Sequence, residues 1–368
     1  MNANDSQRPP EPRLRDTLRQ DLKHPDFFQS LRRDFSELRQ FYIEEEKNLR
    51  LAQMTWYKRG FFLAWWLFKS MMLKLTPARR ILFFVGFVLI LASRSVGIQD
   101  DQIQTSNWEV LGGFLLVFVL MLELKDKLLA RDELEAGQKV QNALMPERSP
   151  NVPGWSLWLF TRPANEVGGD LVDFLRINEE RSGVVLADVA GKGLQAALLM
   201  VKLQATIRAL ASDFQSTSDL MSRINKIFHR DTPSNMFASL LYVELRDNSG
   251  ELRFVNAGHF PPVLLGSSGI REMSKGETGL GLVSASSYSE QIQTLQRGET
   301  FLAYSDGLTE ARNEQGDFFG TERLFRLLSR LGAYSVEGMG QAITSELDQF
   351  VGEARANDDL SLIILRRN

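Results

Sequence analysis

Two long apolar runs constrain the folding of this chain more than any other feature of its sequence. They are ILFFVGFVLILA, residues 81–92, and VLGGFLLVFVLML, residues 110–122. With their flanks, 77–97 and 107–124, they approach the roughly 20 residues of a spanning helix. The alternative is a pair of buried core helices in a soluble domain. Because the runs are apolar all round and no predicted strands lie nearby to cover them, we expect a membrane hairpin.

Basic residues flank this hairpin on both sides. Lys58, Arg59, Lys69, Lys74, Arg79 and Arg80 precede the first run, and Lys125, Lys127 and Arg131 follow the second. The connecting loop, 93–107, has Arg94 but also two aspartates. The positive-inside rule therefore predicts that both ends are cytoplasmic. Residues 60–75 contain two tryptophans and two lysines, which favours an interfacial helix over a third span.

The predicted hairpin separates segments of different composition. Residues 1–58 form a polar, helical cytoplasmic segment, and 59–124 form the membrane region. Residues 125–146 continue as a helical stalk with an apolar edge that includes Leu128, Leu134 and Leu144. Such a helix commonly forms a coiled coil with the same helix of a second copy of the chain, so we expect a homodimer. Residues 147–368 form a second domain, in which strands alternate with helices, and its pattern predicts an α+β fold.

Composition excludes several kinds of chemistry. The net charge is −3, which does not favour nucleic acid as a partner. The chain has no cysteine, which excludes disulfides and thiol nucleophiles. Its three histidines, at 24, 229 and 259, share no short motif, so a zinc site is not expected. The 46 acidic residues are the main supply of metal ligands, and carboxylate oxygens suit Mg²⁺ or Mn²⁺.

Aspartates stand at the ends of several predicted strands. These are Asp170, Asp188, Asp306, and the pair Asp358 and Asp359. One such residue is usually a turn former or a helix cap. Clustered buried carboxylates repel one another, and a cation among them removes that cost. The set therefore predicts a site for two divalent ions.

Glycines surround two of these aspartates. We expect Gly168 and Gly169, in VGGDLVDF, to let the backbone turn before Asp170. Gly191 and Gly193, in DVAGKG, allow a tight turn into the helix that follows, whose N-terminus would attract a phosphate. Lys192 would either help to bind the phosphate at this helix N-terminus or be an exposed lysine of the turn without a role in the site.

Five motifs, in order, carry a family resemblance. They are VGGDLVDF, LADVAGKGLQAALLM, FVNAGHFPPVLL, YSDGLTEARNEQGDFFGTERL and NDDLSLIIL. Together they resemble the bacterial, SpoIIE/RsbU-like branch of the metal-dependent PPM-type serine/threonine protein phosphatases. The resemblance covers about 141–367 and implies an αββα sandwich.

The resemblance also implies a ligand set for two Mn²⁺ or Mg²⁺ ions. Asp188 would bridge both ions, together with the backbone carbonyl of Val189. Asp170 would serve the second ion, and Asp306 and Asp358 the first. Asp173, Lys192 and Asp359 would be accessory. His259 has no catalytic role in the family, and we expect it to fix the end of a hairpin by hydrogen bonding.

The implied reaction is hydrolysis of phosphoserine or phosphothreonine by a metal-activated water, with Asp170, Asp188 and Asp306 as catalytic residues. The implied substrate is an anti-sigma-factor antagonist of the STAS type, and the implied location is the bacterial inner membrane with the catalytic domain in the cytoplasm. Two alternatives are a non-catalytic scaffold of the same fold and a GGDEF-type nucleotide cyclase. The cyclase is disfavoured because Leu171 and Val172 do not match its signature.

Overall fold

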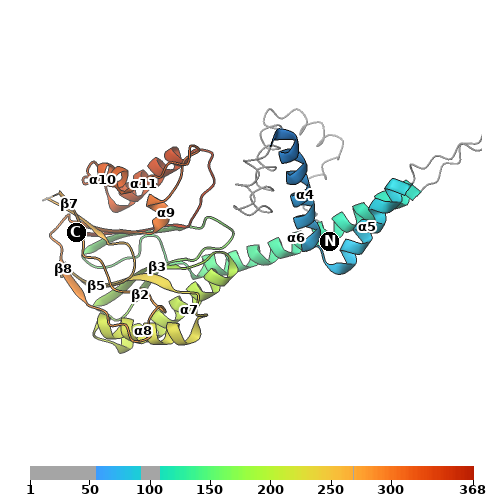
Figure 1. Cartoon of the computed structure of the whole chain (residues 1–368). Helices are drawn as coiled ribbons and strands as arrows, with labels where there is room; N and C mark the ends of the chain where they lie inside the picture. Colours follow the sequence, from blue (N-terminus) through green and yellow to red (C-terminus); the bar gives the residue numbers. More distant parts are fainter. Residues whose placement is uncertain (1–54, 93–107, 268) are drawn as a thin grey trace, which may run out of the picture. The chain divides into compact units, whose positions relative to one another are not determined.

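The computed structural model describes residues 55–92, 108–267 and 269–368 (Figure 1). Most of the predicted segment 1–58 and the predicted loop 93–107 therefore lie outside the described residues. The chain divides into two compact units, Met1–Lys127 and Leu128–Asn368.

Three helices make up the described part of the first unit. They are α4 (Trp56–Lys74), α5 (Pro77–Ala92) and the beginning of α6 (Trp108–Leu144). Both predicted apolar runs are thus helical. Helices α5 and α6 approach closely where Gly86 faces Gly112, since a Cβ on Gly112 would lie 2.5 Å from the Gly86 carbonyl oxygen. At the other end of α5, Arg79 pairs with Glu123 at 2.7 Å and with Asp126 at 2.6 Å.

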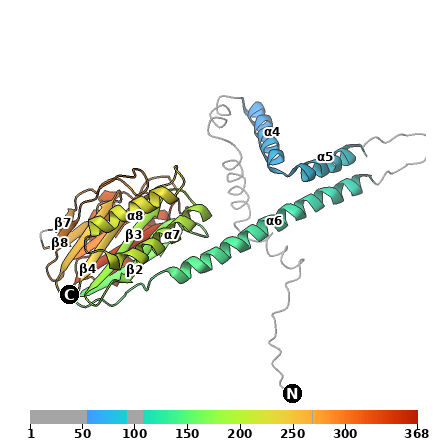
Figure 2. The ribbon, with the colours of Figure 1, turned by 90° about the horizontal axis from the view of Figure 1, so that it is seen from below.

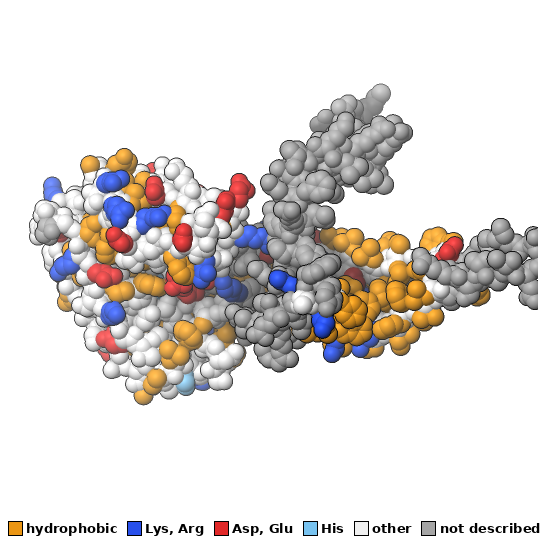
Figure 3. Space-filling view, turned by 45° about the horizontal axis from the view of Figure 1, so that its top comes forward, with side chains coloured by type: hydrophobic (Ala, Val, Ile, Leu, Met, Phe, Trp, Pro, Cys, Tyr) orange, Lys and Arg blue, Asp and Glu red, His pale blue; other side chains and the backbone are white. Residues whose placement is uncertain are grey.

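Large apolar side chains cover the outside of these helices, and Figure 3 shows them gathered in orange at the right of the view. Phe84, Val88, Phe114 and Leu120 are between 46% and 69% exposed. Among the described helices, one segment meets simple length and hydropathy criteria for a membrane span, and it is Leu194–Asp213 in the second unit. One face of that segment packs into a protein core. The membrane character of the first unit therefore stays a prediction.

The second unit contains two five-stranded antiparallel sheets, each with helices on its outer face (Figure 1). In the first sheet the order is β1 (Trp155–Arg162), β10 (Leu360–Arg367), β9 (Thr300–Tyr304), β6 (Val263–Gly266) and β7 (Gly269–Glu272). In the second it is β2 (Asp170–Arg176), β3 (Arg181–Val189), β4 (Ala238–Arg246), β5 (Glu251–Ala257) and β8 (Gln291–Thr294).

Helices cover the outer face of each sheet. Helices α7 (Leu194–Leu210) and α8 (Thr217–Asp231), joined by the 3₁₀ turn Ala211–Asp213, lie on the β2–β8 sheet (Figure 2). Helices α9 (Asp306–Thr309), α10 (Thr321–Leu328) and α11 (Val336–Val351) cover the β1–β7 sheet. The predicted αββα sandwich is confirmed.

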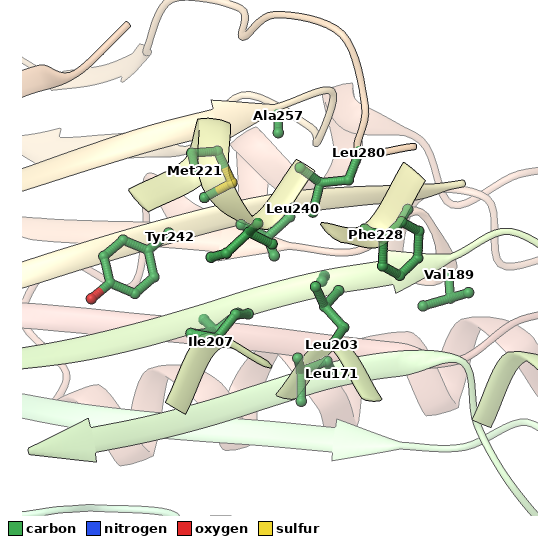
Figure 4. Packing of buried hydrophobic residues seen from close by; sticks show 14 of the residues in the cluster. Leu171, Val189, Leu203, Ile207, Met221, Phe228, Leu240, Tyr242, Ala257 and Leu280 are labelled. Carbon is green, nitrogen blue, oxygen red and sulfur yellow. The ribbon is translucent and has the colours of Figure 1, made fainter. Parts of the chain in front are cut away.

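Three apolar layers hold the sandwich together. Figure 4 shows the layer under α7 and α8, where Leu203, Ile207 and Met221 pack over the β2–β8 sheet. A second layer fills the space between the sheets, and a third lies under α11. Strand β2 shows the alternation that builds them, because Leu171 belongs to the helix-side layer and Val172 to the inter-sheet layer. Residues of β2 in phase with Val172 therefore face the other sheet.

Candidate active site

The first two aspartates lie on neighbouring strands. Asp170 begins β2 and is directly opposite Asp188 of β3 in the antiparallel register. Directly opposed residues place their side chains on the same face. Since Asp170 is in phase with Val172, that face is the one between the sheets. Asp170 is 3% exposed, and its Oδ2 atom is buried with no hydrogen-bond partner.

The other aspartates lie beside β9 and β10 of the opposite sheet, with Asp306 at the start of α9 and Asp358 just before β10. Buried Ser305, at the end of β9, donates its hydroxyl to the carbonyl of Asp359 at 3.1 Å. The same hydroxyl accepts the N–H of Ser361 at 3.0 Å. Asp306 follows Ser305, and Asp358 precedes Asp359. The Ser305 hydroxyl therefore brings the Asp306 and Asp358 segments together.

Asp359 is an organising residue rather than a free donor for an ion. Its side chain accepts backbone N–H groups from Ala164 at 2.7 Å, Gly169 at 2.7 Å and Asp170 at 3.3 Å. These bonds occupy both carboxylate oxygens. The carboxylate thus holds the backbone that presents Asp170, in keeping with an accessory role.

The chain bends at Gly169 directly before Asp170, as predicted. Neither Gly168 nor Gly169 has a positive φ, so the bend by itself does not require glycine. A Cβ on Gly168 would lie 2.6 Å from Asp359 Oδ2, and one on Gly169 would lie 3.1 Å from the Val189 carbonyl oxygen. Close approach of neighbouring groups therefore favours glycine at these positions. By contrast, Gly191 and Gly193 have φ values of 110° and 73°, as the predicted tight turn requires.

The carboxylates strongly perturb one another. Burial, with repulsion from Asp306 and Asp358, raises the pKa of Asp188 to about 7. Burial, followed by repulsion from Asp188, raises the pKa of Asp170 well above its usual range. Burial and the charge of Asp358 raise the pKa of Asp306. These effects show that the aspartates from the two sheets share one electrostatic site.

The donor chemistry of this site fits a hard divalent cation. It offers carboxylate oxygens, one buried oxygen without a partner, and a backbone carbonyl at Val189 next to Gly169. Among the described residues, no three His, Cys, Asp or Glu side chains converge closely enough to hold one ion. Ions such as Mg²⁺ commonly use one or two carboxylates and several waters, and the two aspartate pairs meet that need.

Lys192 lies beside this site. Its ammonium group donates to the carbonyl of Asn357 at 2.6 Å and to Asp358 Oδ2 at 3.1 Å. It also counteracts the raised pKa values of Asp188 and Asp306. The side chain is 59% exposed, so it can turn toward a substrate.

Asp173 lies on the other face of β2. It is fully buried and forms a two-pronged ion pair with Arg208 of α7, at 2.6 and 2.8 Å. It therefore holds α7 on the sheet instead of facing the ion site. Arg208 was not identified from the sequence, because no local pattern links it to Asp173, which lies 35 positions away.

His259 fixes the open end of the β4–β5 hairpin by hydrogen bonding, as expected. It follows β5 and bonds to Ser239 at the start of β4. Its Nδ1 atom is 2.7 Å from the Ser239 hydroxyl, and its backbone N–H donates to Asn256. Burial lowers the pKa of His259 to about 4, so the imidazole is neutral at physiological pH.

Gln141 of α6 is a second residue that sequence reasoning missed. Its amide donates to the Gly168 carbonyl at 2.8 Å, and its carbonyl accepts the Gly168 N–H at 3.1 Å. Gln141 is 4% exposed. The end of α6 is therefore bonded to the loop that presents Asp170. A single glutamine in a polar helix carries no sequence signal for such a contact.

The chain matches a described family and several known proteins. Residues 178–368 match the family described as Stage II sporulation protein E (SpoIIE). Protein IcfG of Synechocystis is 27% identical over 269 residues, which are 65% of this chain and 42% of that protein. The chain thus covers less than half of IcfG. Phosphoserine phosphatase RsbU of Bacillus subtilis is 25% identical over 239 residues, covering 64% of this chain and 70% of that protein.

A solved structure supports the fold. The SiaA-PP2C domain of Pseudomonas aeruginosa superposes with a TM-score of 0.58 at 20% identity. The superposition covers 66% of this chain and 99% of that domain. At this identity the likeness concerns the fold.

Proposed function

The chain belongs to the SpoIIE family of PP2C-type phosphatases, and on that premise we propose that it is a metal-dependent protein serine/threonine phosphatase. The observation that carries the proposal is the buried, unpartnered Oδ2 of Asp170 beside Asp188, whose pKa is raised to about 7. Neutral or paired groups are the rule inside proteins. Such a pair of carboxylates is suited to a cation.

We assign the ion-binding roles as the resemblance implies them. Asp188 and the Val189 carbonyl would serve both of two Mn²⁺ or Mg²⁺ ions, Asp170 one of them, and Asp306 with Asp358 the other. When bound, such ions would supply a water of lowered pKa for hydrolysis of the phosphate ester. Asp359 and Gln141 orient the Asp170 loop, and Lys192 is placed to meet the negative phosphoryl group.

Different observations disfavour the two rival functions. A GGDEF-type cyclase is excluded as a reading of VGGDLVDF, because the chain has the SpoIIE-type two-sheet fold. A non-catalytic scaffold would have no need of the ion-binding aspartates. Every aspartate that the family pattern requires is present, which favours an enzyme.

The substrate class follows from the relatives. RsbU is named a phosphoserine phosphatase, so we propose a phosphoserine or phosphothreonine protein as the substrate. The family resemblance further implies a regulatory protein of the STAS type. The test is phosphate release from a phosphoserine protein and from p-nitrophenyl phosphate. We expect release with Mn²⁺, loss in excess EDTA, and recovery when Mn²⁺ is restored. Full activity in excess EDTA would refute the proposal.

We further propose that 77–124 is a hairpin in the bacterial inner membrane, with the catalytic domain in the cytoplasm. The exposed apolar side chains of α5 and α6 support this proposal, because a bilayer removes them from water. Reporter fusions after residue 97 and after residue 132 should report opposite sides. Recovery of the full chain in the soluble fraction without detergent would contradict it.

We also propose a homodimer through the stalk, with contacts at Leu128, Leu134 and Leu144 of α6, of which Leu128 and Leu144 are exposed. Gln141 would pass a change in stalk pairing to the Asp170 loop. Fusing a leucine zipper in successive registers should change the Mn²⁺ dependence of activity. The same Mn²⁺ dependence of activity in every register would show that the stalk only connects the two parts of the chain and does not regulate the site.

A further inference from the structure

A groove of about 320 Å³ opens beside the aspartates. Its lining includes Gly307, Asp358, Arg312 and Phe318. Gly307 follows Asp306 directly, so the groove is continuous with the ion site. A protein substrate whose phosphate lies at the aspartates has its neighbouring residues within reach of this groove.

The groove lining carries charges of both signs. Glu310 lies near the aspartates, because its backbone N–H donates to the Asp306 carbonyl at 2.7 Å. Lys192 pairs with Asp358. Arg312 also lines the groove, and no described residue forms an ion pair with it.

Arg312 is held in place by an aromatic ring instead of a carboxylate. Its guanidinium carbon lies 4.4 Å from the ring centroid of Phe318, and the two residues pair as an antiparallel bridge. The turn between them is closed by the Asn313 side chain, which accepts the N–H of Asp317 at 2.8 Å. Stacking covers one face of the planar guanidinium and leaves its N–H edge available.

We propose that this groove binds the substrate chain beside the phosphorylated residue, and that Arg312 selects an acidic side chain there. The guanidinium would take the carboxylate in a two-pronged hydrogen bond, while Phe318 packs against the substrate backbone. This inference rests on the proposed phosphatase function and adds to it a sequence preference. Arg312 is a specificity-determining residue, and the ion-binding aspartates do not depend on it.

The test is a charge exchange in the full chain, held in detergent. Three probes are compared with Mn²⁺: a phosphoserine peptide flanked by glutamates, the same peptide flanked by lysines, and p-nitrophenyl phosphate. We expect the wild type to prefer the glutamate peptide by about tenfold in kcat/KM, the ratio that corresponds to about 1.4 kcal/mol. Arg312→Glu should reverse this preference and leave p-nitrophenyl phosphate hydrolysis within about twofold of the wild type.

A matched variant and the aryl phosphate separate the possible failures. Arg326→Glu makes the same change on exposed α10, away from the groove lining, and should keep the wild-type preference. If Arg312→Glu preferred the glutamate peptide as strongly as the wild type does, the inference would be overturned. Hydrolysis of p-nitrophenyl phosphate by both proteins would in that case still support the proposed function. A wild type that hydrolyses none of the three probes would overturn both.

Discussion

The carboxylate of Asp359 accepts the backbone N–H of Gly169 at 2.7 Å, across 190 positions of sequence. Gly169 precedes β2 of one sheet, and Asp359 precedes β10 of the other. The bond therefore joins the two sheets where the aspartates meet. It makes the position of Asp170 depend on a residue that binds no ion in our assignment.

Replacing Asp359 by Asn tests this dependence. The amide keeps one acceptor but directs an NH₂ group at a backbone donor, so we expect a loss of about 2 kcal/mol of stability. Because the Asp170 loop is then less well held, Mn²⁺ affinity should fall about tenfold. Thermal unfolding and Mn²⁺ titration measure the two effects. The control is Asp348→Asn, which breaks an exposed pair with Arg162; equal behaviour of the two variants would contradict the account.

Gly307 offers a steric test of the same region. An added Cβ would lie 2.0 Å from the Asp359 backbone oxygen. Since backbone cannot move aside cheaply, Gly307→Ala should lower the free energy of unfolding by about 2–3 kcal/mol and reduce phosphatase activity. Gly332→Ala is the matched control, because no atom lies within 4 Å of the position that its Cβ would take. Urea unfolding in which both variants match the wild type would refute the predicted clash.

The raised pKa of Asp188, about 7, predicts how stability depends on pH without metal. Between pH ~4, the ordinary value, and pH 7, the folded state keeps a proton that the unfolded chain releases. The free energy of unfolding should therefore fall as pH rises through this window and then level off. Asp170 acts in the same direction. The fall should be about 2 kcal/mol, after allowance for partial solvent access.

Urea unfolding at about pH 5 and about pH 8 in EDTA measures this effect. Asp188→Asn should be more stable than the wild type at the higher pH, and nearly equal to it at the lower pH. Saturating Mn²⁺ should remove the fall for the wild type, because the ion replaces the proton. A wild type that becomes more stable as the pH rises in EDTA would show that the sign is wrong.

The sequence predicted those features that repeat locally. The alternation of strands and helices predicted for 147–368 is present, and β3, β9 and β10 end or begin beside the predicted strand-end aspartates. Helix α8 was missed although Ser216 caps it by accepting the Asp219 N–H. The short strands β6, β7 and β8 have four residues each, too few for a periodic pattern.

In the candidate site, too, the features marked by local sequence patterns were predicted and the long-range contacts were not. The aspartates were identified because each stands at a strand end next to small residues, and five motifs in order gave them a family context. The contacts of Asp359, Gln141 and Arg208 could not be identified, since each joins segments at least 27 positions apart. Only tertiary packing brings such partners together. The same is true of Gly168 and Gly169, whose close neighbours come from distant segments.

Equilibrium binding of Mn²⁺ tests the central claim most directly, because it asks whether Asp170, Asp188, Asp306 and Asp358 form one cation centre. Free Mn²⁺ would be followed by electron paramagnetic resonance as it is titrated into the wild type, Asp188→Asn and Asp213→Asn. Asp213 is an exposed aspartate just past the far end of α7. We predict two bound ions in the wild type and in Asp213→Asn, and loss of tight binding in Asp188→Asn. Equal binding by Asp188→Asn and the wild type would contradict the account.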